Sequence, residues 1–178
     1  MSDNVKLKIQ STLLELSSRV DIEKINVSML VKECGISRTL FYYYYQDIFA
    51  VLEDILSTQI GKLITECIKI DDPKESIHHF VWCYSQQFHF LKKIRRTRYY
   101  EEAEKMIAQA IRKYFRIILN HKAAGIAITP DEIEFHIDFM SNGMTMYFFQ
   151  HCEDDSFDID HVSQQFYRMV MRFFEQNP

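Results

Sequence analysis

The stretch from residue 27 to residue 45, VSMLVKECGISRTLFYYYY, decides the fold of this chain. Its first half predicts a short helix that ends at Gly35, because a residue without a Cβ atom can take the left-handed conformation at a helix C-terminus. Ser37 is then the predicted N-cap of a second short helix. Two short helices joined by a glycine turn have the anatomy of a helix-turn-helix, although an ordinary helical hairpin has the same pattern.

The second short helix has one apolar and one polar face. The polar face carries Arg38, Thr39 and Tyr43. A short helix with an exposed arginine and tyrosine near its N-terminus suits insertion into the major groove of DNA. The apolar residues of this stretch are expected to face the core of a small domain, and they are Leu30, Ile36, Leu40, Phe41 and Tyr45.

The rest of the chain also has helical periodicity. Apolar residues from Val5 to Val20 recur every three or four positions, which places them on one face of a first helix. The chain has only four glycines and three prolines, which argues against β-sandwiches, barrels and glycine-rich nucleotide-binding folds. The sequence therefore predicts an all-α fold: a three-helix head on a long fourth helix, followed by an all-helical domain. Helices beyond the head are predicted at residues 47–69, 73–91, 99–120, 130–150 and 160–175.

Residues 35–45, after a long first helix, resemble the N-terminal domain of the tetracycline-repressor (TetR) family of transcriptional regulators. The resemblance covers about residues 5–56 by motif and the rest of the chain by architecture. It departs from the family at Ile48, where a phosphate-contacting lysine is usual. The residues that match the family pattern are Gly35, Ile36, Ser37, Tyr42, Tyr45 and the pair Val51-Leu52.

The resemblance implies a DNA-binding domain over residues 1–46 and a helical effector-binding and dimerisation domain over residues 47–178. It implies a repressor that binds a near-palindromic DNA operator as a homodimer and is released or modulated by a small-molecule effector. Arg38 would pair with a guanine, and Thr39 and Tyr43 would reach base edges or a thymine methyl group. The residues expected to contact phosphates are Ser28, Ser37, Tyr42 and Tyr44.

The charge of the chain does not indicate a strong nucleic-acid binder. The formal net charge is −4, and residues 1–47 carry six basic and six acidic side chains. A neutral head releases few counterions on binding, so we expect modest non-specific affinity and a shallow salt dependence. The neutral head and Ile48 also support an alternative, an all-helical dimeric binding module that has lost specific DNA recognition.

The resemblance places a ligand pocket between the helices of the second domain and a dimer face on its last two long helices. The candidate pocket residues are Trp82, Gln86, Phe88, His89, Met106 and Tyr114, with plain core packing as the alternative. The candidate dimer residues are Ile137, Met140, Met144, Phe148, Phe166, Val170 and Phe173. The alternative is that both helices only complete the core of the subunit.

The remaining motifs indicate neither catalysis nor a resident cofactor. The sequence contains no G-x-S-x-G, P-loop or H-E-x-x-H motif, so we expect no enzymatic activity. His79 and Cys83 have a spacing that suits a metal ion, but two ligands are too few and no metal site is predicted. Basic residues between 92 and 98 form either a solvated helix end or an anion contact. Scattered cysteines and the lack of a long apolar run favour a cytoplasmic protein without a membrane span.

Overall fold

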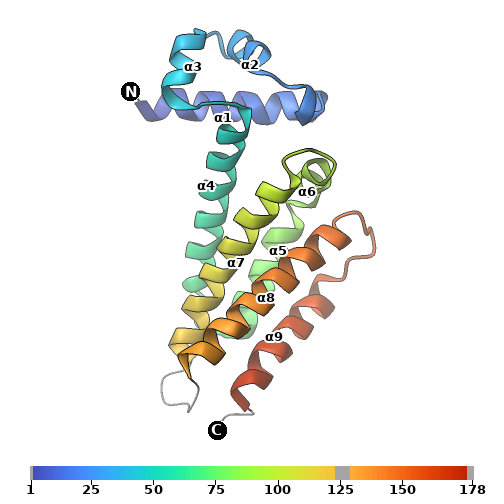
Figure 1. Cartoon of the computed structure of the whole chain (residues 1–178). Helices are drawn as coiled ribbons and strands as arrows, with labels where there is room; N and C mark the ends of the chain where they lie inside the picture. The colour runs from blue at the N-terminus through green and yellow to red at the C-terminus, as the bar shows by residue number, and fades with distance from the viewer. Residues whose placement is uncertain (1, 123–128, 176–178) are drawn as a thin grey trace. The chain divides into compact units, whose positions relative to one another are not determined.

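The computed structural model describes residues 2–122 and 129–175, with side chains for residues 4–119 and 129–172. Within these ranges the chain is helical and contains no strand, which confirms the predicted all-α class (Figure 1). A single 3₁₀ turn, η1 (Ile22–Lys24), interrupts the α-helices. The helices are α1 (Ser2–Arg19), α2 (Val27–Cys34), α3 (Arg38–Tyr44), α4 (Ile48–Ile68), α5 (Pro73–Ser85), α6 (Phe88–Arg95), α7 (Tyr100–Lys122), α8 (Pro130–His151) and α9 (Ile159–Glu175).

The chain packs as two compact units. The head unit comprises residues 1–59 and 93–103, and the helical unit comprises residues 60–92 and 104–178. The sequence places the boundary before α4, at residue 46. In the structure the first half of α4 and residues 93–103 pack with the head, because both contribute apolar side chains to its interior.

The head unit has a core built from one face of each helix. Ile9 and Leu13 of α1 are fully buried, as are Leu30 of α2 and Phe41 of α3. Val51 of α4 is also fully buried in this unit. The helical spacing of the apolar residues explains the arrangement, since i and i+4 lie on one side of a helix. Burial of Leu30, Phe41 and Tyr45 agrees with the sequence prediction, whereas Ile36 and Leu40 are only half-buried.

Local capping fixes the turn between α2 and α3. Gly35 has φ 64° and ψ 37°, the left-handed conformation expected from its sequence position. The Asn26 side chain accepts a hydrogen bond from the N–H of Met29 at 3.1 Å, so it caps α2. Ser37 Oγ accepts from the N–H of Leu40 at 3.1 Å and caps α3. Side-chain caps from Asn26 and Ser37 therefore stabilise the N-termini of α2 and α3.

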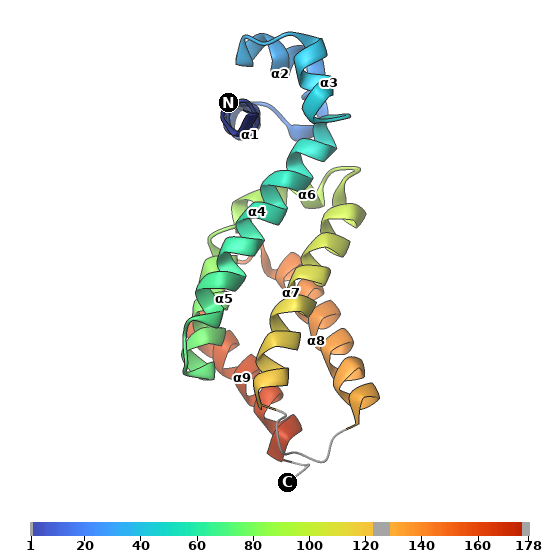
Figure 2. The same ribbon diagram turned by 90° about the vertical axis from the view of Figure 1, so that its left-hand side faces the viewer.

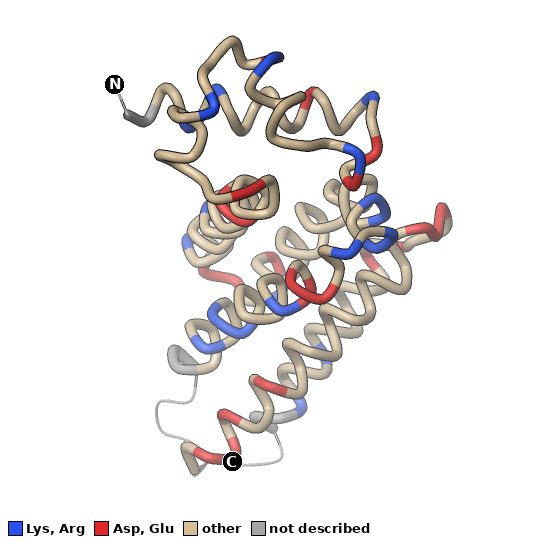
Figure 3. Tube along the Cα trace, turned by 45° about the horizontal axis from the view of Figure 1, so that its top comes forward, with Lys and Arg blue, Asp and Glu red and all other residues tan. Residues whose placement is uncertain are grey.

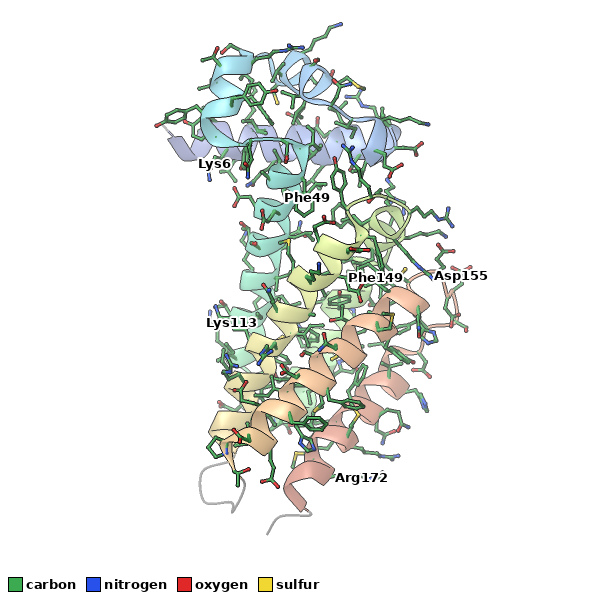
Figure 4. The ribbon with its side chains drawn as sticks, in the orientation of Figure 1. Lys6, Phe49, Lys113, Phe149, Asp155 and Arg172 are labelled. Carbon is green, nitrogen blue, oxygen red and sulfur yellow. The ribbon has the colours of Figure 1, made fainter. Side chains whose placement is uncertain are left out.

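Residues 93–103 attach to the head through three separate contacts. Lys93 Nζ donates to the carbonyl oxygen of Ser17 at 2.7 Å. The backbone N–H of Arg98 donates to the Glu23 carboxylate at 2.8 Å. The rings of Phe49 and Tyr99 stack with centroids 5.2 Å apart, and Figure 4 labels Phe49 at the start of α4. Lys93 and Arg98, which belong to the basic run between residues 92 and 98, therefore make contacts within the head unit.

The predicted helix over residues 73–91 is divided in the structure into α5 and α6. The turn after α5 tightens, because the N–H of Gln87 donates to the carbonyl oxygen of Tyr84, three residues back, at 2.9 Å. Helix α6 then continues through residues 92–95, which the sequence assigned to a helix end and turn. The sequence has no proline or glycine at the break, so the hydrophobic pattern alone could not locate it.

The helical unit has a core of aromatic rings contributed by α5, α7, α8 and α9, the helices that Figure 2 shows as ribbons. The rings of Phe80 and Tyr114 stack at 4.6 Å with an interplanar angle of 8°. The rings of Tyr84 and Phe148 stack at 4.2 Å with an angle of 17°. Helix α5 also packs along α9. Across the part of the chain that the structure describes, we find no helix both long enough and apolar enough to cross a lipid bilayer.

Candidate nucleic-acid interface

Helix α3 presents polar and aromatic side chains to solvent. Arg38 and Thr39 are exposed at its N-terminus, and Tyr42 and Tyr43 are exposed one turn later. Tyr43 is 79% exposed, the highest value among the exposed large apolar and aromatic side chains of the described residues. Core packing therefore cannot explain this tyrosine, and a role at a binding surface can.

The side chain of Arg38 is positioned by the preceding helix. Its guanidinium donates a hydrogen bond to Ser28 Oγ at the start of α2, and both residues are exposed. The contact joins two residues ten positions apart and holds the arginine at the junction of α2 and α3. Because the side chain is already oriented, less rotamer freedom is lost when the guanidinium pairs with a base.

The seven residues predicted to contact DNA gather on one region of the head. Six of them are exposed, and Tyr44 is half-buried with its ring edge-on to Tyr43 at 4.9 Å. The Ser37 hydroxyl oxygen accepts the capping bond of α3, which leaves its O–H free to donate to a phosphate. The exposed members of the set are Ser28, Ser37, Arg38, Thr39, Tyr42 and Tyr43.

The electrostatics of the head match its neutral charge. Basic and acidic side chains are interspersed along the head unit (Figure 3). Arg19 forms an ion pair with Glu33, and Lys24 with Asp21 at 2.7 Å. Ile48 is buried, so the position at which the TetR family usually has a lysine offers no phosphate contact here. Arg38 is consequently an exposed cation at the tip of α3 whose contact is with a neutral hydroxyl.

A hydrogen-bond network joins α3 to α1 and α4 beneath this surface, and the sequence did not predict it. The Tyr45 hydroxyl donates to Asp54 Oδ2 at 2.7 Å, and Gln10 Nε2 donates to the same oxygen at 3.0 Å. Lys6, labelled in Figure 4, places its Nζ 3.4 Å from that carboxylate and over the Tyr45 ring. The Tyr45 hydrogen bond is the main cause that lowers the pKa of Asp54. Gln10 lies 44 positions from Asp54 and 35 positions from Tyr45 in the sequence, so no local sequence pattern indicates these contacts.

The six predicted pocket residues lie in different environments. Tyr114 is fully buried, Phe88 and Met106 are half-buried, and Trp82, Gln86 and His89 are exposed. An open pocket of about 200 Å³ lies where the end of α4, the start of α5 and α7 meet. Its wall includes Ser76, whose Oγ hydrogen-bonds with the Tyr114 hydroxyl at 2.8 Å. The common pocket of the six residues stays a prediction.

The described members of the predicted dimer set lie in the core of the helical unit. Ile137, Met140, Met144, Phe148, Phe166 and Val170 are all buried within the single chain, so they fill the subunit core and offer little or no surface to a second copy. The side chain of Phe173 lies outside the described residues. Other apolar residues on the same two helices are exposed, and they are Phe135, Phe139, Met146 and Met169. A symmetric contact through α8 and α9 would have to use these.

Comparison with known proteins places the fold. No family model matches this chain, and no curated protein matches it by sequence. Among similar solved structures is the dihydroxyacetone kinase operon activator DhaS, with a TM-score of 0.74, 13% identity and 97% of each chain covered. The fatty acid degradation regulator FadR from Bacillus halodurans has a TM-score of 0.62, 13% identity, and covers 93% of this chain and 94% of its own.

A third similar structure carries the family name. A transcriptional regulator of the TetR/AcrR family from Thermobifida fusca has a TM-score of 0.55 and 13% identity, and the match covers 93% of this chain and 95% of that one. All three likenesses extend over nearly the whole chain, including the head and the helical unit. This chain therefore has the fold of the TetR/AcrR-family transcriptional regulators.

Proposed function

We propose that this protein is a transcriptional regulator that binds double-stranded DNA through α3. The observation that carries the proposal is the exposed N-terminal face of α3, where Arg38, Thr39 and Tyr43 extend from a helix whose ends are capped. The fold supports it, because the similar solved structures include a protein named as a transcriptional regulator of the TetR/AcrR family. The alternative is a dimeric helical module without DNA recognition.

Base recognition rests on few side chains. A guanidinium can pair with O6 and N7 of a guanine through two hydrogen bonds, and Arg38 has the exposure and the orientation for this. Thr39 and Tyr43 can reach neighbouring base edges, while Ser28, Ser37 and Tyr42 contact phosphates. With a neutral head, the salt dependence of binding is shallow, since the slope scales with the number of phosphates neutralised.

The regulator acts as a homodimer in this proposal. Phe135 and Phe139 are 66% and 68% exposed on α8, and their rings stack with centroids 6.4 Å apart. Such a pair of exposed phenylalanines is costly to leave in water and suits burial against a second copy. Two heads related by a two-fold axis then read a near-palindromic operator.

A small-molecule effector completes the proposal. A ligand that binds one dimer conformation more tightly than the other would change the fraction of dimers able to bind the operator. The resemblance implies a repressor, whereas the similar protein DhaS is named an operon activator.

The test is selection of bound sequences from a random DNA pool with the full chain. We expect enrichment of a near-palindrome with two half-sites about one or more helical turns apart. A pool that stays random after repeated rounds, under conditions in which the protein is folded and dimeric, would favour the module without DNA recognition.

A further inference from the structure

Three side chains able to bind a metal ion converge in the helical unit. His79 and Cys83 lie one turn apart on α5, and Glu66 lies in the last part of α4. His79 Nε2 is 3.5 Å from Cys83 Sγ and 3.6 Å from Glu66 Oε2. The three ligand atoms all lie within 4.8 Å of one another. The sequence spacing gave only two ligands, and the folded chain supplies the third.

The hairpin between α4 and α5 holds these ligands in place. Residues 69–72 connect the end of α4 to the start of α5, and the chain reverses direction between the two helices (Figure 2). Ser76 Oγ donates to the carbonyl oxygen of Cys67 at 2.9 Å in the buried interior, which fixes the register of α5 against α4. The Asp72 side chain caps α5 through the N–H of Lys74 at 2.7 Å. The backbone that carries the three ligands is therefore anchored on both sides of the turn.

The two distances from His79 Nε2 agree with tetrahedral coordination of zinc. With Zn–N of about 2.05 Å and Zn–S of about 2.3 Å, tetrahedral geometry separates the nitrogen and sulfur ligands by about 3.5 Å. A nitrogen and an oxygen ligand would be about 3.4 Å apart on the same basis. The distances from His79 Nε2 to Cys83 Sγ and to Glu66 Oε2, 3.5 and 3.6 Å, lie within a few tenths of an ångström of these values. All three ligand atoms lie within 4.8 Å of one another.

The donor set selects the class of ion. An imidazole nitrogen, a thiolate sulfur and a carboxylate oxygen suit borderline ions such as Zn²⁺, whereas Mg²⁺ and Ca²⁺ prefer oxygen ligands alone. Three protein ligands leave a fourth position for water or another small ligand. Entry is open, since the side chains of Glu66 and His79 are 60% and 33% exposed.

We propose that Glu66, His79 and Cys83 bind one zinc-class divalent metal ion, with the fourth coordination position open to solvent. Binding replaces the proton of the Cys83 thiol, which is released to water. The proposal goes beyond DNA recognition and rests on residues of the helical unit alone. Without a metal ion the same contacts would be only a weak sulfur hydrogen bond and a partly exposed ion pair.

The chain contains its own reporter for this site. Trp82 is the single tryptophan, and its ring stacks with that of His79 at 6.0 Å and an interplanar angle of 23°. A paramagnetic ion such as Co²⁺ bound to His79 would therefore quench the fluorescence of Trp82. Co²⁺ bound to a thiolate also has a sulfur-to-metal charge-transfer band in the near ultraviolet, which a purely histidine or carboxylate site lacks.

The experiment titrates the metal-free full chain with Co²⁺ and then with Zn²⁺, with thiols kept reduced by a phosphine. We expect one Co²⁺ per chain, a charge-transfer band and quenching of Trp82 that saturate together, and reversal by Zn²⁺. Titration without a thiolate band, or binding at several sites per chain with no common end point, would overturn the proposal.

Variants make the assignment specific. Glu66→Gln, His79→Gln and Cys83→Ser should each weaken Co²⁺ binding at least about tenfold. Glu66→Gln is the most informative because its side chain is largely exposed and its loss should leave the fold intact. His161→Gln, which removes an exposed histidine outside the cluster, is the matched control and should bind Co²⁺ as the original chain does. Equal affinity in Glu66→Gln and the control would refute the three-ligand site, while the DNA selection would be unaffected by that failure.

Discussion

The substitution Tyr45→Phe removes one hydroxyl from the network that joins α3 to α4. The ring of Tyr45 stays buried in the head core, so packing is preserved and only the polar contacts change. The substitution removes the bond that the hydroxyl donates to Asp54 Oδ2 at 2.7 Å and the weaker one that it accepts from Gln10 Nε2 at 3.2 Å. Gln10 keeps its own bond to Asp54 Oδ2 at 3.0 Å. A hydrogen bond to a charged group contributes about 1.5–3 kcal/mol, and the Asp54 side chain is 33% exposed.

We therefore expect Tyr45→Phe to lower the free energy of unfolding by about 2 kcal/mol at neutral pH. For a chain of this size that corresponds to a decrease in Tm of about 4–8 °C. Chemical denaturation followed by circular dichroism measures it, at fixed protein concentration because the proposed dimerisation would contribute to stability. Tyr42→Phe is the control, since Tyr42 is exposed on the same helix and should change stability by less than about 0.5 kcal/mol.

The pH dependence gives a second, independent readout. The pKa of Asp54 lies below its ordinary value of 3.8, chiefly because the Tyr45 hydroxyl donates to the carboxylate and secondarily because of Lys6. A lowered pKa in the folded state adds stability above pH 3.8 that is lost as the pH falls through the folded-state value. The difference in the free energy of unfolding between the original chain and Tyr45→Phe should therefore become smaller below about pH 4. Equal stability of Tyr45→Phe and Tyr42→Phe at neutral pH would refute the network.

Two further predictions concern the helical unit. Among the described residues the buried Tyr84 hydroxyl has no hydrogen-bond partner, so Tyr84→Phe should keep or raise the free energy of unfolding by up to about 1 kcal/mol. Tyr114→Phe should lower the free energy of unfolding by about 1 kcal/mol, because the variant loses the hydrogen bond to Ser76. Denaturation curves that show Tyr84→Phe to be less stable than Tyr114→Phe would contradict both expectations. Phe139→Glu should shift the dimer toward monomer in sedimentation experiments, whereas Leu7→Glu, 62% exposed on the head, should not; an intact Phe139→Glu dimer would exclude this surface.

Local chemistry made the head predictable from sequence. Gly35 and Ser37 determine the turn and the cap through their own backbone and side chain, and the structure places both as expected. The break between α5 and α6 has no such residue, so the hydrophobic pattern continued across it. Asp54 was missed for another reason, because its partners come from α1 and from the residue after α3.

Periodicity also could not orient the last helices. Helix α8 is apolar on more than one side, so both Ile137 and Phe139 are candidates for either the core or an interface. The structure buries Ile137 completely and leaves Phe139 68% exposed. Periodicity also could not predict the proposed metal ligands, because the proximity of Glu66 to His79 depends on how α4 and α5 pack.

The central claim, that α3 reads DNA through Arg38, is tested most directly by the affinity of Arg38→Ala for the selected operator. Arg38→Ala should lose about 1–3 kcal/mol of operator-binding free energy and relax the preference at one base pair in each half-site. Arg19→Ala is the charge-matched control, because Arg19 is paired with Glu33 at the end of α1, and it should leave base preference unchanged. Unchanged affinity and sequence preference in Arg38→Ala would contradict base recognition by Arg38.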